Sequence, residues 1–144
     1  MRVLGLDLGN KTLGIAMSDS EGILVSPFEN FEFANRNFLC AAKRVKEICS
    51  IYNIETIALG NPIMLSGEES IRSNITRKFA SMILKLNPTL EIVLIDERFT
   101  SVEAKSILKE CNYSETNKQR VRDSVAACLI LESYLDRIKR KEEK

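Results

Sequence analysis

The chain has 144 residues, of which 44% are hydrophobic, and its 21 basic and 20 acidic residues leave a formal net charge of +1. This size fits one domain with a proper core, and the near-neutral charge gives no compositional reason to expect nucleic-acid binding. Histidine is absent from the sequence, which excludes Ser-His-Asp and Cys-His catalysis and mixed Cys/His zinc sites, so any chemistry must use carboxylates, hydroxyls or lysines.

Three consecutive strands are predicted at the N-terminus. The segments RVLGLDL, LGIAMSD and GILVSP are rich in apolar residues and are separated by Gly, Asp and Ser, which are typical of tight turns. One acidic residue, Asp7, stands inside the first of these hydrophobic runs. A buried carboxylate is costly unless a partner satisfies it, so Asp7 indicates a salt bridge, a protonated acid or a bound metal.

A helix, a strand and a second helix are predicted in the middle of the chain. Apolar residues recur at helical spacing between Phe38 and Tyr52, and the strand TIALG comes next. Ser66 and Glu69 match a capping box, which predicts the start of the second helix at this point. An apolar stripe from Ile71 to Leu86 continues this helix.

One strand and two helices are predicted in the last third of the chain. The strand EIVLID is followed by a second capping box, Thr100 and Glu103, which opens a short helix through about Glu110. A final helix covers roughly Lys118 to Lys139. The mixed-charge end of the chain, residues 139–144, is expected to fray.

The resulting order of elements is β-β-β-α-β-α-β-α-α. It predicts an α/β fold with a five-stranded mixed sheet flanked by helices, in which a three-strand antiparallel meander is extended by two parallel strands. Neither a linker nor a repeat divides the chain, so residues 1–138 are expected to form one domain. Ligands in open sheets gather at strand ends near a change of strand order, here the ends of the first, fourth and fifth strands.

Two further acidic residues occupy positions where a structural residue is unexpected. Glu97 directly follows the apolar strand IVLID. Asp123 shares a helical stripe with the apolar Ala127 and Ile130, so it is expected to face inward. Asp7, Glu97 and Asp123 can therefore meet at one edge of the sheet, and oxygen-only ligands suit Mg²⁺ or Mn²⁺. Such metals activate water and stabilise the leaving oxygen in phosphodiester hydrolysis.

The segments GLDLGNKTLGIAMSD, DERFTS and RDSVAACLILESYL resemble the YqgF family of pre-16S rRNA nucleases, also called Holliday junction resolvase-like proteins. The resemblance runs over about residues 1–138. The matching motif positions are Asp7, Lys11, Glu97, Arg98, Thr100, Asp123, Ala126 and Ala127. The resemblance implies an RNase H-like fold, an acidic metal-binding triad formed by Asp7, Glu97 and Asp123, and divalent-metal-dependent cleavage in maturation of the 5′ end of 16S rRNA. Activity on branched DNA is the older proposal for the family.

Polar residues near the acids are expected to form a rim that faces phosphate. They are Lys11, Arg98, Thr100, Lys118, Arg120 and Arg122. Two positions depart from the family pattern. Thr12 stands where an arginine usually follows the motif lysine, which removes a cation from the phosphate contact, and Asn61 replaces the leucine of a more usual Gly-Leu-Pro.

Each acid also has a purely structural explanation. Asp7 can hydrogen-bond the turn that follows it, Glu97 can pair with Arg98, and Asp123 can pair with Arg120 or Lys118 in the first turn of its helix. All three acids together, at the spacing of one motif set, favour the metal site.

The leading interpretation is a metal-dependent nuclease that acts on structured nucleic acid, either precursor rRNA in the pre-ribosomal small subunit or branched DNA. Actin-like and sugar-kinase ATPases begin with a similar Asp-x-Gly motif, but they close two such domains around ATP and this chain has room for one. A noncatalytic nucleic-acid-binding or ribosome-assembly module is the other alternative, which would keep the fold and use the site for docking.

The cysteines and the apolar runs indicate the compartment. Cys40, Cys49, Cys111 and Cys128 lie singly, without a Cys-x-x-Cys pair, which favours reduced thiols packed as small hydrophobic side chains. The longest apolar runs are short and interrupted by charge, so we expect neither a membrane span nor a signal peptide. The expected location is the cytoplasm.

Overall fold

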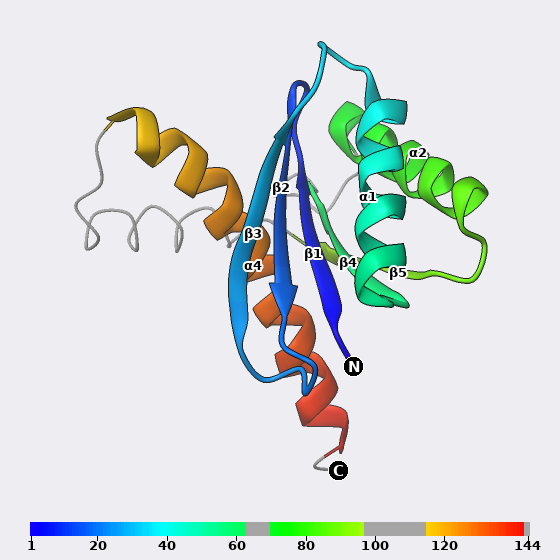
Figure 1. Ribbon diagram of the computed structural model, residues 1–144, viewed down its shortest axis with the longest axis vertical. Coiled ribbons are helices and arrows are strands. Elements are labelled where there is room, and N and C mark those ends of the chain that lie inside the picture. Colours follow the sequence, from blue (N-terminus) through cyan, green and yellow to red (C-terminus); the bar gives the residue numbers. More distant parts are fainter. Residues whose placement is uncertain (63–69, 97–114, 143–144) are drawn as a thin grey trace.

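The computed structural model describes residues 1–62, 70–96 and 115–142, and for residues 115–124 it describes the path of the backbone (Figure 1). The elements are β1 (Val3–Leu8), β2 (Thr12–Ser18), β3 (Val25–Glu32), α1 (Phe38–Tyr52), β4 (Thr56–Asn61), α2 (Ile71–Leu86), β5 (Glu91–Asp96) and α4 (Glu115–Glu142). The short helix predicted between Thr100 and Glu110 lies outside the described residues.

The strands form one five-stranded mixed sheet in the order β3-β2-β1-β4-β5. The β1–β2 and β2–β3 pairs are antiparallel, and the β1–β4 and β4–β5 pairs are parallel. Helices α1 and α2 cover one face of the sheet and α4 covers the other (Figure 1). Strand β1 is therefore central and packed on both faces, which explains its nearly unbroken apolar sequence. The predicted α/β fold is confirmed.

The third strand differs from the prediction. It spans Val25–Glu32, whereas the apolar pattern placed it at GILVSP, and the apolar Ile23 and Leu24 are 57% and 70% exposed before the strand begins. Strand β3 is at the edge of the sheet and contains Pro27, next to an irregularity in its register with β2. Proline is tolerated at an edge strand or a bulge, so Pro27 is compatible with this strand. Pairing with β2 therefore sets the bounds of the strand, and the local apolar pattern did not predict them.

The predicted start of the second helix is wrong. Helix α2 begins at Ile71 with Ser70 as its N-cap, instead of Ser66. The Ser70 hydroxyl accepts a hydrogen bond from Ser73 N at 3.1 Å and donates one to Pro62 O at 3.0 Å. Because Pro62 directly follows β4, this contact between distant residues fixes the helix start. Ile71 is 79% exposed and is not part of the buried stripe.

Helix α4 extends beyond its predicted bounds of 118 and 139, and the end of the chain that was expected to fray is helical as far as Glu142. Basic residues fill the last turn of α4, where the helix dipole favours cations. The helix approaches β1 very closely at Gly5. A Cβ atom at Gly5 would lie 2.7 Å from Ala127 O and 2.7 Å from Leu131 Cβ.

The direction of α4 follows from its contacts with two glycines. Gly5 contacts Ala127 and Leu131, whereas Gly22, which lies beside the carbonyl of Met1, faces Leu135. Later residues of α4 therefore lie toward the start of β1, and the helix runs antiparallel to the strand. The early turns of α4 lie toward the end of β1 that carries Asp7.

We expect Gly5→Ala to destabilise the fold by about 1–3 kcal/mol, because the added methyl group overlaps backbone and Cβ atoms that cannot easily move. Urea denaturation measures the change. Gly9→Ala is the matched control and should lose less stability, because a Cβ there would be less crowded, at 3.2 Å from Thr12 Oγ1 and 3.3 Å from Thr12 O. Equal stability of Gly5→Ala and the wild-type chain would show that α4 does not approach β1 this closely.

Candidate functional site

The sheet face beneath α4 changes from apolar to polar along β1. Its apolar half is formed by Val3, Ala16, Ala58, Val93 and Ile95. Asp7 follows Gly5 by two positions, so its side chain is on this same face. Asp7 pairs with Gly14 of β2, and Gly14 pairs with Asn30 of β3. We call Asp7, Gly14 and Asn30 the Asp7 row, which crosses three strands where the apolar half ends.

Asn30 is the member of the Asp7 row that sequence reasoning missed. Its Oδ1 atom is buried and has no hydrogen-bond partner in the part of the chain that the structure describes. Gly14 has no side chain, so no side chain of β2 stands between Asp7 and Asn30 in this row, and their Cα atoms are two strand spacings or roughly 10 Å apart. Carboxylate and amide oxygens are ligands that a hard divalent cation with its water ligands prefers.

The other two predicted acids are only partly placed. Asp123 is on the backbone of α4 one turn before Ala127, toward the Asp7 end of β1. Glu97 directly follows Asp96, the last residue of β5, and lies outside the described residues. Within the described ranges, His, Cys, Asp and Glu side chains form no group of three or more that could hold a metal. The shared site for Asp7, Glu97 and Asp123 therefore stays a prediction.

The phosphate-facing rim is also partly placed. Lys11 is exposed in the turn between β1 and β2, close to Asp7 along the chain. Lys118, Arg120 and Arg122 are in the early turns of α4, where only the backbone is described, and Arg98 and Thr100 lie outside the described residues. The structure thus places Lys11 at the Asp7 end of the sheet and leaves the rest of the rim as a prediction.

Backbone hydrogen bonds fix the turn that carries Lys11. Gly9 N donates to Thr12 O at 2.8 Å and closes the turn. Phe33 N donates to Lys11 O and Arg36 N donates to Asn10 O, both at 2.8 Å. The turn is therefore attached to the chain that leaves β3, and the Lys11 side chain extends from a fixed backbone.

Arg72 is a second residue that sequence reasoning missed. From the first turn of α2, its guanidinium donates to Leu8 O at 2.9 Å and to Asn10 Oδ1. These partners are more than sixty positions away in the sequence, so no local pattern could identify them. The one local sign that Arg72 has a special role is its charge, because it is a cation in the first turn of a helix, where the helix dipole favours acids.

The two departures from the family pattern lie on opposite faces of the sheet. Asn61 is buried, and its Oδ1 accepts a hydrogen bond from Ser73 Oγ of α2 at 2.8 Å. Asn61 therefore joins β4 to α2 and does not enter the Asp7 row. Thr12 precedes Gly14 by two positions and pairs with Glu32, so it is on the same face as Asp7.

The three cysteines in the described ranges are free thiols. Burial raises the pKa of Cys49 and of Cys128 to about 12, so both stay neutral at physiological pH and are poor nucleophiles. These two thiols pack as small apolar side chains, as predicted, while Cys111 lies outside the described residues.

Among the helices that the structure describes, none is long and apolar enough to cross a membrane.

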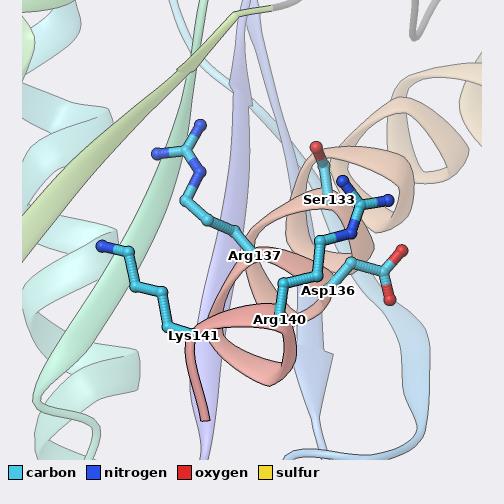
Figure 2. A pocket seen from close by; sticks show the side chains of 5 residues that line it. All are labelled: Ser133, Asp136, Arg137, Arg140 and Lys141. Carbon is cyan, nitrogen blue, oxygen red and sulfur yellow. The ribbon is translucent and has the colours of Figure 1, made fainter. Parts of the chain in front are cut away.

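A pocket on the late turns of α4 lies apart from the Asp7 row. Figure 2 shows the residues that line it, which are Ser133, Asp136, Arg137, Arg140 and Lys141. Because α4 runs antiparallel to β1, this part of the helix is at the opposite end from Asp123 and Asp7. None of the predicted site residues lines it, and we assign it no role.

Solved structures define the class of fold. The chain is similar to Thermus thermophilus RuvC in complex with a Holliday junction substrate, with a TM-score of 0.60 and 12% identity over 96% of both chains. It is also similar to the fowlpox virus Holliday junction resolvase, with a TM-score of 0.58 and 16% identity over 94% of this chain and 99% of that one. The chain thus has the RNase H-like fold of these resolvases.

Sequence comparison then defines the family. The family model described as "RuvX: Holliday junction resolvase" matches residues 1–137. A Fusobacterium nucleatum protein named "Putative pre-16S rRNA nuclease" is 39% identical over 136 residues, which cover 94% of this chain and 96% of the relative. A Bacillus subtilis protein of the same name is 35% identical, over 94% and 98% of the two chains. The chain belongs to the RuvX family, which is the YqgF family that its motifs resemble.

We expect Asn30→Leu to leave the metal-free chain as stable as the wild type or up to about 1 kcal/mol more stable, because it removes a buried acceptor without a described partner. Urea denaturation in chelator measures this. Asn61→Leu is the matched control, and it should lose about 1–3 kcal/mol because it leaves the Ser73 hydroxyl unpaired. A comparable loss in Asn30→Leu would show that Oδ1 has a structural partner.

Proposed function

We propose that this chain is a nuclease that hydrolyses phosphodiester bonds during maturation of the 5′ end of pre-16S rRNA. The Asp7 row carries the proposal, because it puts an acid of the central strand β1 and an amide oxygen of β3 on the face of the sheet that α4 covers. The near full-length similarity to relatives named as pre-16S rRNA nucleases supports this substrate.

In the proposed site, Asp7, Glu97 and Asp123 hold Mg²⁺ or Mn²⁺. Their oxygen donors fit these ions, which commonly keep several waters as further ligands. When bound, such an ion lowers the pKa of a water and stabilises charge on the leaving oxygen. Lys11 extends its ammonium group toward the phosphate backbone. The other rim residues are Arg98, Thr100, Lys118, Arg120 and Arg122, which position the nucleic acid.

The proposed substrate is structured precursor rRNA, free or in the pre-ribosomal small subunit, and the proposed location is the cytoplasm. Residues 1–138 act as one nuclease domain in this proposal. A Holliday junction resolvase is the second candidate, favoured by the description of the matching family and by the fold shared with RuvC. A noncatalytic assembly module would bind the same RNA without cutting it.

Cleavage assays separate these functions. The purified chain is incubated with precursor 16S rRNA and with a four-way DNA junction, in Mn²⁺, Mg²⁺ or chelator. The proposal predicts cuts at the 5′ processing end of the RNA with either ion and none in chelator. Cutting of the junction alone supports the resolvase, and binding of RNA without cutting supports the assembly module.

We expect Asp7→Asn and Asp123→Asn to keep or slightly raise the stability of the metal-free fold, because clustered carboxylates repel one another without a cation. Both variants should lose the stabilisation that Mn²⁺ gives the wild-type chain. Cleavage should fall by at least about a hundredfold, because a ligand of the ion that activates the water is lost. Thermal unfolding with and without Mn²⁺, paired with single-turnover cleavage, measures these effects.

Asp136→Asn is the matched control for this prediction. Asp136 is an exposed acid at the far end of the same helix as Asp123. This variant should cut RNA and respond to Mn²⁺ as the wild type does. If Asp7→Asn instead unfolds at a lower temperature, still responds to Mn²⁺ and still cuts, Asp7 is a structural acid and the proposed metal site is wrong.

A further inference from the structure

The guanidinium of Arg72 bonds two residues of the turn that follows Asp7. Its Nη2 atom donates to the carbonyl of Leu8 at 2.9 Å, and its Nη1 atom donates to the side chain of Asn10. Leu8 directly follows Asp7, and Asn10 directly precedes Lys11. One side chain from α2 therefore connects the chain just after the proposed metal ligand to the chain just before the proposed phosphate-binding lysine.

The location of Arg72 is unfavourable unless these contacts compensate for it. It is partly buried in the first turn of α2, near the positive end of the helix dipole. No acidic residue accompanies it in that turn. Its described partners are a carbonyl oxygen and an amide oxygen, which take up two diverging donors of the planar guanidinium group. A lysine in its place would keep the charge but could not hold both acceptors in this geometry.

We propose that Arg72 is a positioning residue that sets where Lys11 meets the nucleic-acid backbone, by holding the turn of residues 8–11 against α2. The bonds from Phe33 and Arg36 attach the turn to the chain that leaves β3, and Arg72 supplies the attachment to α2. This role rests on the proposed function, because it acts through the phosphate contact of Lys11.

The test measures binding of a fluorescent RNA hairpin that contains the 5′ processing end of pre-16S rRNA, in chelator so that no cleavage occurs. Arg72→Lys keeps the charge and removes the forked contact, and Asn10→Ala removes one acceptor and keeps the arginine. Each should weaken binding about tenfold, as should Lys11→Gln, because each loses one charge-assisted phosphate contact. The dependence of binding on salt should flatten by up to about one unit of slope in each.

A double-mutant cycle shows whether Arg72 acts through Lys11. In the Lys11→Gln background, Arg72→Lys should cause little further loss, so the double variant also binds about tenfold more weakly than the wild type. Arg36→Gln is the matched control, because it removes a nearby exposed charge while its backbone bond to Asn10 remains. The loss of RNA-binding free energy that Arg36→Gln causes should add to the loss that Lys11→Gln causes. Hydrogen exchange at Gly9, whose amide donates to Thr12 O, should speed up in Arg72→Lys and stay unchanged in Arg36→Gln.

Three results would overturn the inference while leaving the proposed function intact. They are wild-type binding by Arg72→Lys, a loss from Arg72→Lys that is equally large in the Lys11→Gln background, and unchanged hydrogen exchange in the turn. A wild-type chain that neither binds nor cuts the RNA would overturn the proposed function and, with it, this role of Arg72.

Discussion

The close approach of α4 to β1 at Gly5 determines what can be near Asp7. A side chain at position 5 would hold the helix away from the sheet, because its Cβ would lie 2.7 Å from Ala127 O and from Leu131 Cβ. With glycine there, α4 packs directly on the central strand and runs antiparallel to it. Because of this direction, its early turns lie toward the polar half of the sheet face, and its apolar residues cover the other half. The backbone of Asp123, one turn before Ala127, thereby lies toward the end of β1 that carries Asp7.

The end of the sheet near Asp7 is held by polar contacts, unlike the apolar half beneath α4. The turn after β1 closes on itself, is attached to the chain that leaves β3, and is bonded by Arg72 to α2. Two further hydrogen bonds attach the start of α2 to the end of β4. Ser70 donates to Pro62 O, and Ser73 donates to Asn61 Oδ1. These hydrogen bonds join α2 to the ends of both central strands. A site at this end therefore has a fixed scaffold beside it, which preorganised catalysis requires.

Sequence reasoning found the elements whose patterns are local. Helix α1 and strand β5 have the predicted bounds, because an amphipathic stripe and a short apolar run are sufficient to define them. The third strand and the start of α2 were misplaced, because edge-strand pairing and the Ser70–Pro62 bond join residues that are apart in the sequence. Asp7 was found because a carboxylate in an apolar run is conspicuous. Asn30 was not among the candidates, because its place in one row with Asp7 appears only in the register of three strands, and Glu97 and Asp123 stay predicted ligands.

The central claim is that the Asp7 row forms part of a divalent metal site, and paramagnetic broadening tests it most directly. Mn²⁺ is titrated into the ¹⁵N-labelled chain, and the loss of each backbone amide signal is followed by NMR. The account predicts that the signals of Asp7, Gly14 and Asn30 broaden first and that broadening declines along the sheet toward Gly22. Broadening that is strongest at the late turns of α4, or equal along the sheet, would contradict it.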